Sequence, residues 1–218
     1  MTADLPESLA DSWRPAGTTT GESSVMVASI TAETTLYEPL EATDLADLAA
    51  SKIPLRSLFV VDLSVSPSLS TIGVSPSSVF EKAAPKAKNQ FVDTVEDEGL
   101  VVEATRDTLE FEAPNGEEGK WYVLDVSYPL ESETESDDDA DDGRSDTDRI
   151  SAEANVAVWP TDSSFGVAGG ILPLEDGVAG VPDDAVDPER DRDTIAELVE
   201  TIDLEGDGES KDENDNDE

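Results

Sequence analysis

The second half of the chain repeatedly alternates apolar residues with polar or small ones. Every even-numbered residue is apolar from 122 to 130 and again from 150 to 158. From 165 to 171, apolar residues or glycine hold the odd-numbered positions. Side chains of a strand point alternately to its two faces, so each stretch predicts a strand with one buried face. A turn-forming segment at 160–163 separates the last two stretches, and we therefore expect an antiparallel meander.

The rest of the chain adds further strands and amphipathic helices. Strand-like apolar rows lie at 25–37, 59–65 and 100–111, the first with a parity change near 28–29 that predicts a bulge. Helical spacing appears in two places: Phe80 to Val95, with Pro85 predicted to kink or split the helix, and Ile195 to Ile202. Asp187-Pro188 is a typical helix start for the second. We predict an α+β fold with an antiparallel sheet of about six strands and two or three packed helices.

Composition predicts one folded domain with acidic appendages. We expect an N-terminal segment at 1–22 and a single α+β domain at 23–203. Residues 131–148 hold ten acids and one arginine, which predicts a disordered hairpin insertion. The composition of residues 204–218 predicts a disordered acidic tail.

The formal net charge of the chain is -40. The segments 131–148 and 203–218 carry -9 and -8, so -23 remains on the other 184 residues. In molar salt the screening length falls to about 3 Å, and the resulting self-repulsion largely vanishes. An acidic folded body is typical of proteins from salt-accumulating halophilic archaea. The alternative, an acidic protein disordered throughout, conflicts with the regular apolar rows.

The same charge and the residue types exclude several classes. Direct binding to nucleic acid or an anionic membrane is disfavoured by repulsion. No apolar run approaches about 18 residues, and no secretion signal precedes the domain, so we expect a cytoplasmic protein. The chain has no histidine and no cysteine, which removes thiolate and imidazole chemistry. We expect no cofactor and no metal site: calcium-loop spacing fails at 137–143, and at 203–208 no exit helix follows.

Two groups of residues are candidates for binding. Trp121 and Trp159 lie on the opposite strand parity from Tyr122 and Val158, so they face the other side of the sheet. If helices cover both faces, the two tryptophans belong to the core; if one face is open, they line an apolar groove. Three of the six lysines are clustered in one predicted helix, where they either dock an acidic partner or balance charge: Lys82, Lys86 and Lys88.

The order of elements resembles the PsbP-like fold. The segments that carry the resemblance are KWYVLDV at 120–126, ANVAVWP at 154–160, FGVAGG at 165–170 and IAELVETI at 195–202. That resemblance implies an antiparallel sheet with helices on both faces, in a family whose members generally bind partners or assist assembly rather than catalyse. The chain is also similar to a conserved haloarchaeal protein family of unassigned function, which opens with a Leu-Pro-x-Ser-Leu…Trp segment like that at 5–13.

Two function classes follow. The first is a non-enzymatic cytosolic accessory or interaction protein of a halophilic archaeon, with a protein as its partner. The second is a small-ligand binder or a carboxylate-based hydrolase with a pocket on the sheet face. Among 53 acids the sequence singles out no catalytic pair, so it favours a non-enzyme without deciding the question. A filled second sheet face favours the first class, and an open pocket with converging carboxylates favours the second.

Overall fold

The computed structural model describes residues 5–25, 28–40, 51–129, 149–174 and 186–204. The predicted insertion at 131–148, and the predicted tail apart from Leu204, lie outside the described residues. Residues 137–143, where the calcium-loop spacing fails, lie outside them as well, and of residues 203–208 only Asp203 and Leu204 are described.

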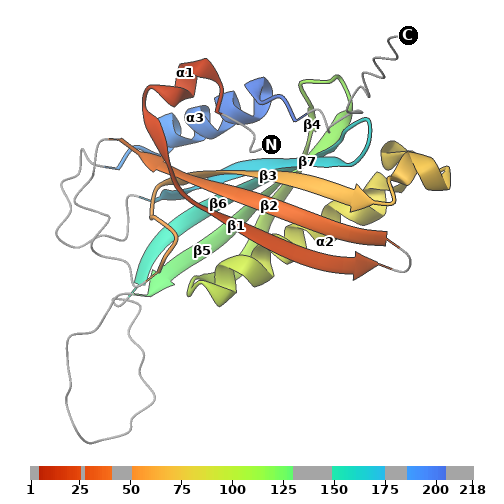
Figure 1. Ribbon diagram of the computed structural model, residues 1–218. Coiled ribbons are helices and arrows are strands. Elements are labelled where there is room, and N and C mark those ends of the chain that lie inside the picture. Colours follow the sequence, from red (N-terminus) through yellow and green to blue (C-terminus); the bar gives the residue numbers. More distant parts are fainter. Residues whose placement is uncertain (1–4, 26–27, 41–50, 130–148, 175–185, 205–218) are drawn as a thin grey trace, which may run out of the picture.

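Within these described ranges, one antiparallel sheet of seven strands forms the centre of the structure (Figure 1). Every pair of neighbouring strands is antiparallel. From one edge to the other the order is β1 (Trp13–Val25), β2 (Ala28–Pro39), β3 (Ser57–Ser66), β7 (Phe165–Pro173), β6 (Arg149–Pro160), β5 (Glu118–Pro129) and β4 (Val101–Glu112).

The predicted meander is confirmed, since β4, β5, β6 and β7 are neighbours in chain order. The α+β class with an antiparallel sheet is confirmed too, but the expected count of about six strands is too low. The missing strand is β1, which begins at Trp13, within the predicted N-terminal segment. As an edge strand rich in Thr, Ser and Gly it has no apolar row to reveal it. The parity change near 28–29 marks the start of β2, and the irregularity in this hairpin falls between Pro15 and Gly17.

Helices cover the sheet on both sides (Figure 1). Outside the sheet, the described residues form α1 (Glu7–Ala10), the 3-10 turn η1 (Leu69–Ile72), α2 (Pro76–Asp97) and α3 (Pro188–Thr201). Helix α2 runs through Pro85 as one helix, so the predicted split does not occur. The predicted start of α3 is confirmed, because the Asp187 side chain accepts a hydrogen bond from the Arg190 amide at 3.1 Å.

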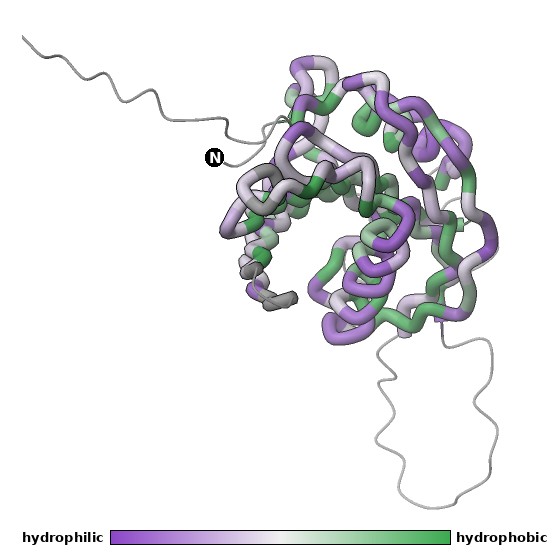
Figure 2. Tube along the Cα trace, turned by 90° about the vertical axis from the view of Figure 1, so that its right-hand side faces the viewer, coloured by the Kyte–Doolittle hydropathy of each residue, from purple (hydrophilic) through white to green (hydrophobic). Residues whose placement is uncertain are grey.

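Two hydrophobic clusters hold the layers together. The first lies between α2 and the even-numbered row of β5 and β6, and includes Phe80, Leu124 and Val156. The second lies between α3 and the odd-numbered row, with Ile195 and Leu198 fully buried. Figure 2 shows hydrophobic and hydrophilic residues alternating along the chain trace, which is the pattern that gives each strand two different faces.

Helix α3 is held close to the sheet over β7. A Cβ atom added at Gly170 would lie only 2.8 Å from Cγ1 of Ile195, so glycine permits this approach. A buried ion pair joins the helix to the segment before β3, with Arg56 Nε 2.8 Å from Asp191 Oδ2. These contacts hold α3 over β7. The part of the same sheet face that β4 and β5 form is therefore not filled by the helix, and the candidate site lies there.

A candidate binding cleft beside helix α3

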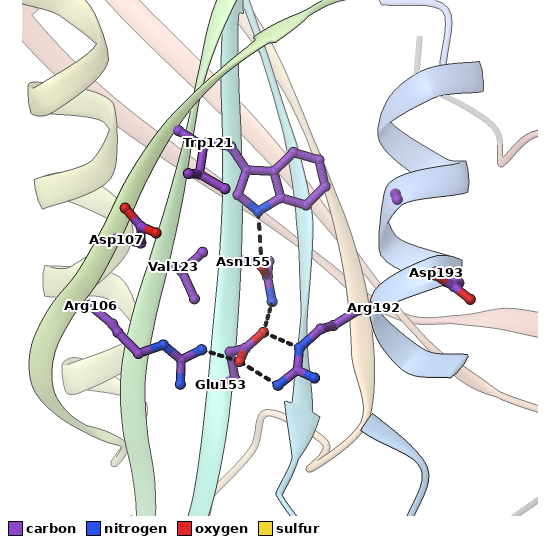
Figure 3. A pocket seen from close by; sticks show the side chains of 10 residues that line it. Arg106, Asp107, Trp121, Val123, Glu153, Asn155, Arg192 and Asp193 are labelled. Atoms are coloured by element: carbon purple, nitrogen blue, oxygen red, sulfur yellow. Dashed lines mark hydrogen bonds and ion pairs between the residues drawn. The ribbon is translucent and has the colours of Figure 1, made fainter. Parts of the chain in front are cut away.

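An open cleft of about 430 Å³ lies between α3 and strands β4, β5 and β6 (Figure 3). Each of the four elements contributes side chains to its lining. They are Arg106, Asp107 and Leu109 from β4; Trp121 and Val123 from β5; Glu153 and Asn155 from β6; and Arg192, Asp193 and Ala196 from α3.

Strand register explains why the β5 and β6 residues gather here. Val123 pairs with Asn155, and the next positions on that face pair Trp121 with Ala157 and Asp125 with Glu153. Directly opposed residues in an antiparallel pair share a face, so these side chains all point toward the α3 side. The register therefore forms a patch that is apolar at the Trp121 end and charged at the Glu153 end.

Glu153 is the centre of a polar network at the charged end. Its side chain is 1 % exposed, yet it is an acid. Arg192 donates from Nε and Nη2 to the two carboxylate oxygens, at 2.9 and 2.8 Å. Asn155 Nδ2 donates at 2.9 Å, and Arg106 Nη2 donates to the same carboxylate. Four donors thus satisfy this buried carboxylate, as burial of a charge requires.

The network continues in both directions from Glu153 (Figure 3). Asn155 Oδ1 accepts a hydrogen bond from Trp121 Nε1 at 2.8 Å. Arg106 Nη1 lies 3.0 Å from Asp125 Oδ1. A continuous chain of polar contacts therefore joins β4, β5, β6 and α3 and sets the distance between the walls of the cleft.

The hydrogen bonds decide the protonation state of Glu153. Burial raises the pKa of its carboxyl, but the bonds from Arg192, Asn155 and Arg106 outweigh burial and lower the pKa to about 2. The same contact raises the pKa of Arg192, against an opposing effect of burial. Both partners are therefore charged at any pH near neutral.

Asp191, one residue before Arg192, is a second buried acid, but it does not line the cleft. Burial raises the pKa of its carboxyl, and the neighbouring Arg56 guanidinium acts in the opposite direction. Its contact with Arg56 anchors α3 to the sheet, so we assign it to the fold rather than to the site.

The two tryptophans face the same side of the sheet, as their parity predicts, but they occupy different surroundings. Trp159 is 2 % exposed and belongs to the core beneath α3. Trp121 is half-buried and lines the cleft. The Phe111 ring stands edge-on between them, with centroids 5.8 Å from Trp121 and 6.2 Å from Trp159. Helices lie on both faces of the sheet. Trp121 nevertheless remains accessible, because α3 covers only part of the sheet face to which both tryptophans point.

The lysine cluster lies elsewhere. Lys82 and Lys86 are exposed and Lys88 is half-buried on α2, which packs on the opposite face of the sheet from the cleft. Within the described residues, none of the three forms an ion pair with an acid. The structure thus does not bring the lysines together with the tryptophans, and their docking role stays a prediction.

Four polar residues of the site were not predicted from the sequence: Arg106, Glu153, Asn155 and Arg192. A signal was present in β6, where Glu153 and Asn155 interrupt a row that continues with Ala157 and Trp159. Polar residues on the second face of a strand whose neighbours are all buried indicate a satisfied polar network. Among the described residues, no group of acidic side chains is arranged to hold a metal ion.

The fold and the cleft define an α+β protein with one antiparallel sheet between helices and a braced cleft on one face. The chain belongs to the DUF6517 family, described as a domain of unknown function, whose model matches residues 3–203. That range includes every residue of the cleft. No curated protein and no solved structure matches the chain. In the described part of the chain, no helix combines the length and the apolar character needed to cross a bilayer.

Proposed function

We propose that this chain is a non-enzymatic accessory protein that acts by binding, and that the cleft beside α3 receives its ligand. The cleft, at about 430 Å³, falls within the roughly 300–1,000 Å³ typical of small-molecule sites. It combines the apolar surface of Leu109, Trp121 and Ala196 with a few fixed polar groups. That combination supports recognition of a small molecule or of a single side chain from a partner.

The observation that carries the proposal is the saturation of Glu153. A general acid must be protonated near the working pH, and a carboxyl with a pKa of about 2 is not. As a base it is equally poor, because its two oxygens already accept from Arg106, Asn155 and Arg192. Glu153 therefore acts as a brace that holds the walls of the cleft, which supports binding rather than proton transfer.

A carboxylate-based hydrolase is the second candidate. Asp107 on β4 and Asp193 on α3 are exposed acids that line the cleft from two different elements. Converging carboxylates are the feature that this class requires. The test is an assay of the wild-type protein with a panel of ester, glycoside and phosphate substrates. A hydrolase would cleave one of them and would lose that activity when both aspartates are replaced with Asn. We expect the wild-type protein to cleave none.

The binding proposal is tested by filling the cleft. Ala196→Trp places a large ring in the cleft and leaves every residue of the Glu153 network unchanged, and Glu197→Trp adds the same ring at an exposed position of α3. In an NMR screen of small fragments, we expect hits to shift the Trp121 indole signal in the wild type and in Glu197→Trp. The same hits should fail to bind to Ala196→Trp. Fragment binding that survives in Ala196→Trp contradicts the proposal.

The cellular setting is part of the same proposal. We propose a salt-rich cytoplasm, supported by the charge of -40 on 218 residues, with no direct binding to nucleic acid or membranes. A relationship to PsbP-like proteins and a protein partner remain proposals that rest on the sequence resemblance.

A further inference from the structure

We infer that the cleft selects an organic cation, an ammonium group held against Trp121 in a cleft whose rim carries Asp107 and Asp193. This inference rests on the proposed binding function and adds the chemical class of the ligand. Three separate properties of the lining support it: the half-buried ring of Trp121, the balanced charges of the two arginines, and the excess of negative charge.

Trp121 offers a ligand its ring rather than a hydrogen bond. Its Nε1 already donates to Asn155 Oδ1 at 2.8 Å, and Phe111 meets it at an interplanar angle of 88°. The π face of an indole is negative and is the best natural platform for a cation. A half-buried tryptophan whose polar atom is already used thus favours a cationic or apolar group.

The two arginines do not form an anion site. Arg192 uses Nε and Nη2 on Glu153, and Arg106 uses its two Nη groups on Glu153 and Asp125. Glu153 and Asp125 thus balance the two guanidinium charges, so a carboxylate or phosphate ligand meets no uncompensated positive charge in this network.

The charge of the lining favours a cation. Three acids and two arginines line the cleft, and Asp125 further neutralises Arg106. Figure 3 shows Asp107 and Asp193 on opposite sides of the Trp121 and Asn155 column, on β4 and α3. A bare metal ion needs several oxygen ligands in one shell. No such group exists among the described residues, so an organic cation fits better than a metal.

The test compares three probes of similar size and different charge: benzylammonium, benzyl alcohol and phenylacetate. Each is titrated into the full chain in about 1 M KCl, where screening over about 3 Å leaves only direct contacts. Indole NMR signals report the binding, with the Trp121 signal assigned from Trp121→Phe. We expect saturable shifts with benzylammonium, at least about fivefold weaker binding of benzyl alcohol, and none of phenylacetate.

Matched variants identify the acids responsible. Asp107→Asn and Asp193→Asn should each weaken benzylammonium by about fivefold and leave benzyl alcohol unchanged. Glu103→Gln on β4 and Glu200→Gln on α3 remove the same charge at exposed positions outside the cleft and should change neither probe. An amide NMR spectrum of each variant verifies that it is folded.

The possible outcomes distinguish the inference of a cationic ligand from the broader proposal that the cleft binds a ligand. If benzyl alcohol or phenylacetate binds at Trp121 as tightly as benzylammonium, the cationic class is wrong and the binding cleft stands. If the control variants weaken benzylammonium as much as the cleft variants do, the effect is general charge and the inference is wrong. If no probe of any charge moves the Trp121 signal, both the inference and the binding proposal fail.

Discussion

Arg192 holds Glu153 with two parallel hydrogen bonds, from Nε at 2.9 Å and from Nη2 at 2.8 Å, one to each carboxylate oxygen. One partner is on α3 and the other on β6, so this fork fixes a helix to the sheet at one end of the cleft. Bidentate pairs impose a geometry that a lysine could not impose. The shape of the cleft thus depends on a side chain that a ligand does not need to touch.

Loss of the Glu153 charge should destabilise the protein. In Glu153→Gln the size is kept, but two arginines lose a buried counter-ion, and we expect the free energy of unfolding to fall by about 2 to 3 kcal/mol. Chemical denaturation followed by circular dichroism in molar KCl measures the change. Glu200→Gln, which removes an exposed acid from α3, serves as the control and should stay within about 0.5 kcal/mol of wild type. Equal stability of the two variants would show that the network adds nothing to the fold.

The same pair predicts how stability depends on pH. The pKa of Glu153 is about 2 in the folded protein, against 4.5 for an ordinary glutamate. Its contribution is therefore complete above pH 4.5 and is lost as the pH falls toward 2. The difference in unfolding free energy between wild type and Glu153→Gln should shrink over that window. Taking a difference cancels other acids, including Asp191, whose raised pKa acts in the opposite sense. A difference that stays constant from pH 6 to pH 2 would refute the assigned ion pair.

Much of the fold could be predicted because its signals are local. The alternation in β5 and β6 gave the meander, and the spacing of Ile195 and Leu198 gave α3 with its buried face. The strand β1 was not predicted, because an exposed edge strand needs no row of apolar side chains. Helix α2 continues through Pro85, which lies on the exposed side, where the carbonyl group left without a partner by the missing N–H can face water.

The candidate site was predictable only in part, because it forms from contacts distant in sequence. The parity of Trp121 correctly indicated its face of the sheet. Arg106 and Arg192, however, meet Glu153 across 47 and 39 residues of sequence. Nothing local distinguishes these two arginines from the other basic residues, so only strand register and the placement of α3 bring them to one carboxylate.

The close approach of α3 to β7 depends on Gly170. An alanine there would bring a Cβ atom to 2.6 Å from the Ser57 carbonyl oxygen and 2.8 Å from Ile195. We expect Gly170→Ala to lower the unfolding free energy by about 1 to 3 kcal/mol through overpacking. Gly21→Ala on the edge strand β1, where nothing lies within 4 Å of the added atom, should be neutral or slightly stabilising. Thermal melts of the two variants in the same salt compare them directly, and a neutral Gly170→Ala would mean that α3 sits farther from the sheet.

Folding should require high salt because of charges on the folded body itself. Residues outside 131–148 and 203–218 carry -23, and this self-repulsion is screened only when the Debye length becomes short, about 3 Å at 1 M. A chain lacking 131–148 and 205–218 should still unfold as KCl is lowered, with a transition that circular dichroism follows from about 3 M to 0.1 M. A second variant keeps both segments and replaces exposed acids of the body, Glu96, Glu103 and Glu200, with lysine. It should shift the midpoint to lower salt, since each replacement reduces the repulsion within the compact state. If the truncated chain is fully folded at low salt, the dependence belongs to the two acidic segments, and the acidic surface of the body has another cause.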